Sequence, residues 1–380
     1  MKRAPTKDIV LLFLATRFLL LLVTYIGYVL LTQEKYSSAS ITFHTLLTTW
    51  DQWDAKIYLR IAQTGYQPPY DLAFFPLFPL LIAIPGHLLG NWSYLPLGII
   101  ISNAALLISL FIIYQLAADV GGDQVARRTI LYLCIFPTAF FFFAPYNESL
   151  FVLFSAGAIL AFRRHHWWLS GILGLLAALT RNAGILLVIP YLYELWLARE
   201  GILSDRRKLL TEGAPIILIP LGTALYSIYC WKLTGNFLTF ATVQAHWARK
   251  LSWPWQGFIQ TSFELFVHQP FGSSNQVEIL IDTVMTIAFI IFAFIGRKKM
   301  RPTYTIWICL LLLSFLISPS VGQRDAFISS RRFVLEMFPA FITLALLGIN
   351  RPRLHQALLW IFPALLATLS LLFVMGRWMV

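Results

Sequence analysis

The sequence is poor in charged residues and in cysteine. Only 12% of its 380 residues are Asp, Glu, Lys or Arg, against about 25% in ordinary soluble domains, and 58% are hydrophobic. This composition excludes an ordinary soluble domain and indicates an integral membrane protein. The three cysteines (Cys134, Cys230 and Cys309) all fall in apolar stretches, so we expect small buried side chains rather than a disulfide or a metal site.

Motifs for nucleotide, metal or serine chemistry are also missing. The sequence has no P-loop, no dinucleotide-binding glycine pattern, no HExxH and no GxSxG. An enzyme that uses a nucleotide sugar normally brings a soluble nucleotide-binding domain, and no stretch here is long enough for one. We therefore expect a single membrane domain over residues 1–380, in which any activated donor is carried by a lipid and no metal or other cofactor is required.

Long apolar runs predict an all-α polytopic membrane protein with about eleven spanning helices. The first run has a core longer than the roughly 7–15 residues of a cleavable signal, so we expect it to be retained. The run Phe74–Leu89 contains three prolines and a glycine, and we expect it to be broken or to lie along the interface. The predicted spans are Ile9–Leu31, Tyr94–Ala117, Thr129–Ala144, Ser149–Phe162, Trp168–Leu179, Ala183–Leu197, Ala214–Trp231, Val277–Ile295, Thr303–Ile317, Phe333–Gly348 and Ala357–Met375.

The distribution of basic residues orients these spans. More than half of the 29 Lys and Arg residues lie at helix ends on the side of the N-terminus. The positive-inside rule then puts the N-terminus in the cytoplasm and the C-terminus outside. The basic residues are spread over short turns, so we expect no nucleic-acid partner. The two long segments, Thr32–Ser93 and Lys232–Gln276, lie outside, where we expect the function.

Two carboxylates, Asp51 and Asp54, lie just after the first span, at the predicted outer surface. Charged groups at membrane depth are costly and usually functional, so both are candidate catalytic groups. Asp54 can also serve as the N-cap of a short helix that ends near Gly65. The apolar side of this helix is formed by Ile57, Ile61 and Ala62, and we expect Trp50 and Trp53 to anchor the segment at the interface.

Further polar residues are expected on the same side of the membrane. Helix N-capping explains the polar residues Asn147 and Ser149. It does not explain Glu148 between them, which is a third candidate carboxylate. Arg181 interrupts an apolar stretch and needs a carboxylate or phosphate partner. Arg331 and Arg332 precede a predicted span, so they either bind an anion or extend to the interface. The candidate substrate-binding residues are Arg181, Asn182, Gln244, His246, Trp247, Arg249, Arg331 and Arg332.

The chain resembles the PIG-V family, the GPI mannosyltransferase 2 type of GT-C glycosyltransferase, from about Trp50 to Pro339. The first block of matching residues is the most specific, and the later ones are weaker. The matching elements are Trp53-Asp54-Ala55, Ile61-Ala62, Gly65-Tyr66, Ala73-Phe74-Phe75-Pro76, Phe78-Pro79, Tyr146 with Glu148, Arg181-Asn182 before Gly184, and Phe240 to Trp255 with His246-Trp247 and Trp253-Pro254-Trp255.

This resemblance implies a GT-C helix bundle, with interfacial helices in the first outer loop, that acts as an inverting glycosyltransferase. The implied reaction moves a sugar, most readily mannose, from a polyprenyl-phosphate donor to a lipid-linked or cell-surface glycan on the extracytoplasmic face of the cell membrane. Asp54 is the implied base, and Asp51 has no clear family counterpart. Two alternatives stay open: another GT-C transferase for arabinose, glucose or protein, and a membrane transporter or lipid flippase, which would show internal repeats.

Overall fold

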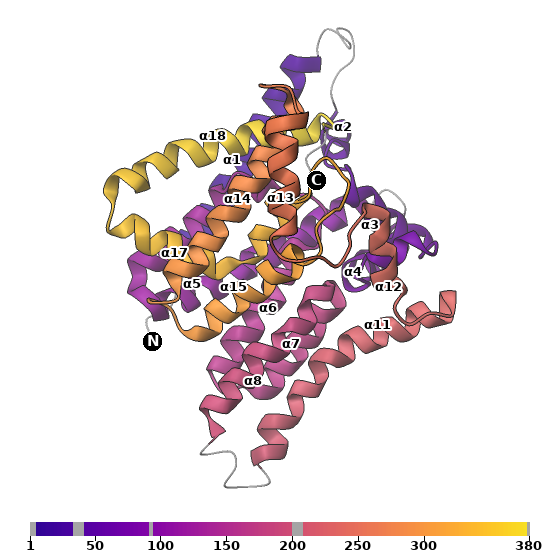
Figure 1. Ribbon diagram of the computed structural model, residues 1–380, viewed down its shortest axis with the longest axis vertical. Helices are drawn as coiled ribbons and strands as arrows, with labels where there is room; N and C mark the ends of the chain where they lie inside the picture. The colour runs from indigo at the N-terminus through magenta and orange to yellow at the C-terminus, as the bar shows by residue number, and fades with distance from the viewer. Residues whose placement is uncertain (1–4, 33–41, 91–93, 200–207, 378–380) are drawn as a thin grey trace. The chain divides into compact units, whose positions relative to one another are not determined.

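The computed structural model describes residues 5–32, 42–90, 94–199 and 208–377 (Figure 1). Within these ranges the chain is helical, and the only strand-like pairing is an isolated bridge between Arg249 and Ser320. The all-α class predicted from the apolar runs is therefore confirmed. Parts of the predicted first outer segment, residues 33–41 and 91–93, lie outside the described ranges.

Five described helices are long and apolar enough to cross a membrane. A sixth span results if two short segments, Ser330–Glu336 and Phe338–Ile349, are taken together across their 82° bend. The chain is therefore a multi-pass integral membrane protein, but the predicted count of about eleven spans is not confirmed, because several apolar runs form helices of only 10–17 residues. The five are α1 (Thr6–Thr32), α5 (Tyr94–Ile135), the segment Leu210–Thr234 that ends in α11 (Leu218–Thr234), α14 (Ser274–Gly296) and α18 (Pro352–Val374).

Helix α5 covers two of the predicted spans and corrects the second. Its backbone leaves helical geometry at Gly121 and Gly122, where Gly122 has φ of 76°, so two arms meet at this break. The second arm ends at Ile135 because the next residue precedes Pro137, a position that disfavours helix. The predicted span Thr129–Ala144 was therefore too long, and its end forms a short 3₁₀ turn, η4 (Ala139–Phe142).

Contacts divide the chain into two compact units, each built from several stretches. Unit 1 comprises Met1–Gly65, Leu77–Leu153 and Leu344–Val380. Unit 2 comprises Tyr66–Pro76 and Phe154–Thr343. The stretches of the two units alternate along the chain, so they do not divide the sequence at one point. The single domain over residues 1–380 stays a prediction.

In unit 1, α1 packs against α5 and α18. Two shorter helices, α3 (Asp54–Thr64) and α4 (Leu77–Leu89), pack on one another and on α5. Of the two alternatives expected for Phe74–Leu89, α4 shows no break, since this helix is continuous although it contains Pro85. Its other proline, Pro79, lies in the first turn, where a backbone N–H has no intrahelical acceptor. Whether α4 lies along the interface stays a prediction. Unit 1 also includes α2 (Phe43–Thr48) and the start of α6 (Glu148–Arg163).

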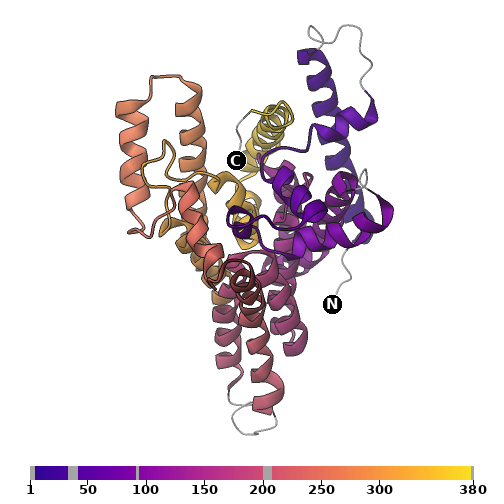
Figure 2. The same cartoon turned by 90° about the vertical axis from the view of Figure 1, so that its right-hand side faces the viewer.

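In unit 2, α7 (Trp167–Thr180) and α11 run side by side in both views (Figure 1 and Figure 2). Glycines permit this close approach. A Cβ added at Gly171 of α7 would lie 2.4 Å from the carbonyl oxygen of Pro215, just before α11, and a Cβ added at Gly222 of α11 would lie 2.6 Å from the carbonyl oxygen of Leu175 in α7. Small residues are the usual means of close helix packing in membranes. The other elements wholly in unit 2 are η2 (Tyr70–Ala73), η5 (Asn182–Leu187), α8 (Val188–Leu197), η6 (Leu209–Gly213), η7 (Ala214–Ile217), α12 (Thr239–Thr242), η8 (Val243–Trp247), α13 (Gln256–Phe263), η9 (Glu264–His268), α14, α15 (Pro302–Leu316), α16 (Ser330–Phe333) and η10 (Val334–Glu336). Residues of α6 and of α17 (Phe338–Ile349) are divided between the two units.

Candidate active site

Asp54 is the first residue of α3 in unit 1. The N-cap position is occupied by Trp53, without a side-chain capping bond, so the expected N-cap role of Asp54 was wrong by one residue. As an acidic residue of the first turn, it still lies at the positive end of the helix dipole. Trp53 has φ of 54°, which is costly for a bulky residue and is typical of functional sites. The predicted helix end at Gly65 is confirmed, with φ of 79°.

The loop before α3 is fixed by the turn before α6, in the same unit. The Tyr146 hydroxyl donates to the backbone oxygen of Gln52 at 3.0 Å, midway between the two candidate aspartates. Trp50 is fully buried, with its ring 4.6 Å from that of Phe143 and 5.9 Å from that of Phe373. The interfacial anchor expected of Trp50 was therefore wrong: this indole packs inside unit 1 and holds the loop in place.

Asp51 lies in this fixed loop and is half-buried. Its Oδ1 has no hydrogen-bond partner among the described residues. Burial raises the pKa of Asp51, while the neighbouring Lys56 opposes the shift. A carboxyl with a raised pKa is suited to proton transfer, so Asp51 remains a candidate beside Asp54.

Glu148 begins α6 and is fully buried in unit 1. The Asn147 backbone oxygen accepts from the Phe151 amide in the first turn, while the Ser149 hydroxyl donates to the Phe142 carbonyl. Because Tyr146 contacts Gln52, the turn that carries Glu148 lies against the loop that carries the aspartates. The structure therefore brings the three sequence-predicted carboxylates into one region of unit 1.

Three of the predicted arginines meet in unit 2 around one phenylalanine. The guanidinium carbons of Arg181, Arg332 and Arg249 lie 4.8, 5.2 and 5.4 Å from the ring centroid of Phe333. All three distances are within cation–π range. Arg181 also forms an ion pair with Glu336, whose side chain is almost fully buried. Three cations gathered on one ring form a site suited to an anionic ligand.

Arg249 is held by the backbone of a neighbouring loop. Its two terminal nitrogens donate to the carbonyls of Ser318 and Ile328, each at 3.2 Å. Backbone bonds from Lys250 to Pro319 and from Ser252 to Ile317 join the two segments at the isolated bridge. The segment Lys232–Gln276 is thus fastened to the loop that precedes α16, and α16 carries Arg332.

Arg331 points to a different partner from Arg332. Its Nε and Nη2 donate to Asp282 at 2.9 and 2.5 Å, in a pair that is 3% and 1% exposed. The Ser330 hydroxyl and the Arg331 amide donate to the same carboxylate at 3.0 and 2.9 Å. Asp282 therefore ties α16 to α14. Sequence reasoning missed it, although a lone carboxylate inside an apolar run was a usable signal.

Asp325 lies in the loop before α16. Burial and the adjacent carboxylate of Asp282 raise the pKa of Asp325 well above its ordinary value, although its bond from the Phe327 amide acts in the opposite direction. A protonated Asp325 can donate to Asp282, which then accepts from three neighbours. Nearby, Arg324 pairs with Glu278 at 3.0 Å.

The remaining predicted residues lie elsewhere in unit 2. His246 packs against Tyr70, with ring centroids 4.6 Å apart, and Trp247 packs edge-on against Phe74 at 6.2 Å. Gln244 precedes them in η8 and accepts from the Arg249 amide at 3.3 Å. Asn182 is exposed at the start of η5. Within the described part of the chain, no three His, Cys, Asp or Glu side chains gather closely enough to hold a metal ion.

Comparisons with known proteins agree on one family. A sequence model of the mannosyltransferase (PIG-V) family matches residues 7–200, just over half of the chain. GPI alpha-1,6-mannosyltransferase 2 of Rattus norvegicus is 34% identical over 152 residues, which cover 38% of this chain and 31% of the rat protein. GPI mannosyltransferase 2 of Schizosaccharomyces pombe is 28% identical over 147 residues, with the same two shares. These matches thus span about a third of the length of the curated relatives.

One solved structure has the same fold. ArnT from Cupriavidus metallidurans, crystallised with undecaprenyl phosphate, superposes with a TM-score of 0.54 at 15% identity. The superposition covers 94% of this chain and 63% of ArnT. At this identity the likeness concerns the fold alone, and it confirms the GT-C architecture that the sequence resemblance implied.

Proposed function

Since the chain belongs to the mannosyltransferase (PIG-V) family, as its sequence motifs implied, we propose that it transfers mannose from a polyprenyl-phosphate donor to a lipid-linked or cell-surface glycan. The observation that carries this proposal is the group of three arginines around Phe333. A leaving phosphate that is anchored by its lipid needs such fixed cations, because the guanidinium fork matches phosphate oxygens.

The proposed reaction is a single displacement. An acceptor hydroxyl gives its proton to the Asp54 carboxylate, and its oxygen forms a bond to the anomeric carbon of the sugar. The bond from that carbon to the phosphate oxygen breaks, and the phosphate keeps the electron pair, so the anomeric configuration inverts. General-base assistance of this kind contributes about 10²–10⁴-fold to the rate. The strained backbone at Trp53 supports Asp54 as the base, because strain at a residue is retained where position matters.

The arginines stabilise the negative charge that builds on the departing phosphate. Arg181, Arg249 and Arg332 take this role in the proposal, with Glu336 fixing the direction of Arg181. Arg331, which we predicted to bind substrate, contributes by holding α16 in place through Asp282. Its ion pair positions the adjacent Arg332, which contacts the ligand.

The other candidates recognise the two substrates. Glu148 and Asp51 are assigned to the hydroxyl groups of the acceptor, because both lie in the region of Asp54. Sugar hydroxyls of the donor are assigned to the polar residues of unit 2, which lie on the segments that carry the arginines. These residues are Asn182, Gln244, His246 and Trp247.

The excess of basic residues at the predicted inner helix ends supports an N-terminus in the cytoplasm and an active site on the extracytoplasmic face of the cell membrane. A lipid-phosphate donor is further supported by the ArnT structure, which contained undecaprenyl phosphate. That similarity also favours the second candidate, a GT-C transferase that moves another sugar from the same class of lipid carrier.

The test is release of sugar from radiolabelled polyprenyl-phosphate mannose by the purified protein, with a membrane glycolipid as acceptor. We expect Asp54→Asn to lose a hundredfold or more in kcat while donor binding is kept. The matched control is Asp119→Asn, which changes an exposed aspartate of unit 1. Full activity of Asp54→Asn would contradict the mechanism, and turnover with a polyprenyl-phosphate pentose or glucose alone would replace mannose by the second candidate.

A further inference from the structure

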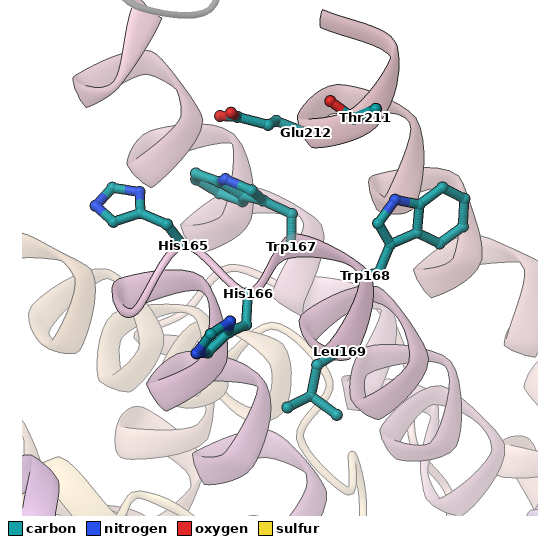
Figure 3. A pocket seen from close by; sticks show the side chains of 7 residues that line it. All are labelled: His165, His166, Trp167, Trp168, Leu169, Thr211 and Glu212. Atoms are coloured by element: carbon teal, nitrogen blue, oxygen red, sulfur yellow. The ribbon is translucent and has the colours of Figure 1, made fainter. Parts of the chain in front are cut away.

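A hollow in unit 2 has no role in the proposed transfer reaction. Its volume is about 530 Å³, which is within the usual range for small-molecule sites. It lies at the turn between α6 and α7 and is closed on the other side by η6, as Figure 3 shows. The lining residues are His165, His166, Trp167, Trp168, Leu169, Thr211 and Glu212.

Trp167 supplies an unused hydrogen-bond donor to this hollow. The residue is 4% exposed, and its indole Nε1 has no hydrogen-bond partner among the described residues. The ring is fixed on two sides, with centroids 5.7 Å from His165 and 5.3 Å from Tyr191. A buried N–H without an acceptor is costly, so a ligand that brings an acceptor oxygen would be stabilised there.

The opposite wall supplies one negative charge. Glu212 belongs to a π-helical turn, and the Tyr191 hydroxyl donates to the Glu212 backbone oxygen at 2.8 Å. Figure 3 shows the carboxylate of Glu212 facing the turn that carries His165 and Trp167. The lining contains no Lys or Arg. A simple anion would therefore be repelled by Glu212, whereas a ligand with both an anionic and a cationic group matches the two walls.

The surroundings are those of a membrane boundary. Trp168 and Leu169 line the same hollow and are 54% and 49% exposed, at the first turn of an apolar helix. Exposed Trp at the end of such a helix is typical of the lipid head-group level. These two side chains offer an apolar surface for acyl chains beside the polar hollow.

We propose that this hollow binds the head group of an aminophospholipid, phosphatidylethanolamine. Its phosphate accepts hydrogen bonds from Trp167 and the imidazoles, and its primary ammonium donates to Glu212. The indole face beside the carboxylate adds a cation–π contact. Phosphatidylcholine fits less well, because its quaternary ammonium has no N–H to donate, and phosphatidylglycerol has no cation at all.

The test is native mass spectrometry of the purified protein with equal amounts of dioleoyl phosphatidylethanolamine, phosphatidylcholine and phosphatidylglycerol. We expect the ethanolamine lipid to be retained about tenfold better than the choline lipid, since a hydrogen bond to a charged group is worth about one factor of ten. Glu212→Gln should remove this preference. The control Glu264→Gln, which changes a glutamate of unit 2 paired with His268 at 3.0 Å, should keep it.

Two further measurements test lipid binding in the hollow if Glu212→Gln does not fold. Trp167→Phe keeps the ring but removes the N–H, and it should weaken retention of the ethanolamine lipid severalfold. Millimolar O-phosphoethanolamine, which has the head group without acyl chains, should displace part of the bound lipid. Equal retention of all three lipids by the wild type, or an unchanged preference in Glu212→Gln, would overturn the assignment, as would lack of any displacement.

Discussion

The carboxylates of unit 1 and the arginines of unit 2 are held in place by different means. Asp51 and Asp54 owe their positions to backbone features: a strained tryptophan, a helix start and a hydrogen bond from Tyr146 to Gln52. Most of the arginines owe theirs to side chains, namely the Phe333 ring and two buried carboxylates, whereas Arg249 is also held by two backbone carbonyls. A base has to be aimed at one proton, which a rigid loop does well, whereas a phosphate clamp has to keep several like charges together.

The largest expected effect concerns the carboxylate that holds α16. Asp282→Asn leaves Arg331 charged and buried without its counter-charge, which costs about 3–5 kcal/mol. We expect a fall of several degrees in the Tm of the purified protein, together with loss of transfer activity.

A control for this variant lies on the same helix. Glu278→Gln breaks a pair with Arg324 whose side chains are 20% and 41% exposed, and pairs of this kind are worth about 0–1 kcal/mol. Equal Tm changes in the two variants would show that the arginine group does not depend on its buried carboxylate.

The next effect tests the ring that the arginines share. Phe333→Leu keeps an apolar side chain but removes the surface on which three guanidinium groups lie. A cation–π contact at an exposed or partly buried site is worth about 0.5–2 kcal/mol. We therefore expect the KM for the lipid donor to rise about tenfold. The kcat should change much less than in Asp54→Asn, since the base is untouched.

Steady-state kinetics with varied donor concentration separates these two results. Phe315→Leu is the matched control, because Phe315 is a buried phenylalanine of unit 2 and no arginine of the described chain lies on its ring. A fall in kcat without a change in KM for Phe333→Leu would show that the arginine group acts on the departing phosphate in the transition state and not in ground-state binding of the donor.

The pH dependence of stability compares Asp51 of unit 1 with Asp325 of unit 2. The pKa of each is raised, by burial alone for Asp51 and by burial with a second carboxylate for Asp325. A group with a higher pKa in the folded state binds more protons when folded, so its effect lowers stability as pH rises above about 4, the ordinary aspartate value. Replacing Asp325 by Asn should therefore raise the Tm at pH 8 and change it less at pH 5.

Thermal melts at both pH values provide this measurement, with Asp119→Asn as the exposed control. We expect Asp51→Asn to show the same trend with a smaller amplitude, because Asp51 is only half-buried and Lys56 opposes the shift. A Tm that falls at pH 8 in Asp325→Asn would mean that the carboxylate, and not the acid, stabilises the loop.

The sequence predicted the fold class and several site residues for physical reasons that can be traced. Apolar runs gave the membrane class. Arg181 was found because an arginine inside an apolar stretch needs a partner, and Arg249 and Arg332 because arginines on the predicted outer segments match an anionic head group. Phe333 and Glu336 were missed, since neither a phenylalanine nor a glutamate beside a span is unusual by itself. Their importance depends on long-range contacts that no local pattern reports.

Trp50 illustrates the opposite error. Its place after a spanning helix predicted an interfacial anchor, but the residue is buried against Phe143 and Phe373, which are 93 and 323 positions further along the chain. A tryptophan at a helix end packs inside a fold as readily as at a lipid boundary when distant aromatic residues meet it. Hydropathy alone cannot separate the two cases.

The smallest expected effect tests whether the loop of unit 1 aims the base. Tyr146→Phe removes one hydrogen bond to Gln52 and leaves the ring packing intact, at a cost of about 1 kcal/mol. If that bond positions Asp54, kcat should fall severalfold while the KM for the donor stays constant, because the arginine group of unit 2 is unchanged. Tyr229→Phe is a suitable control, since this tyrosine is in unit 2 and exposed. An unchanged kcat would show that Trp53 and the start of α3 fix the base without help from the turn before α6.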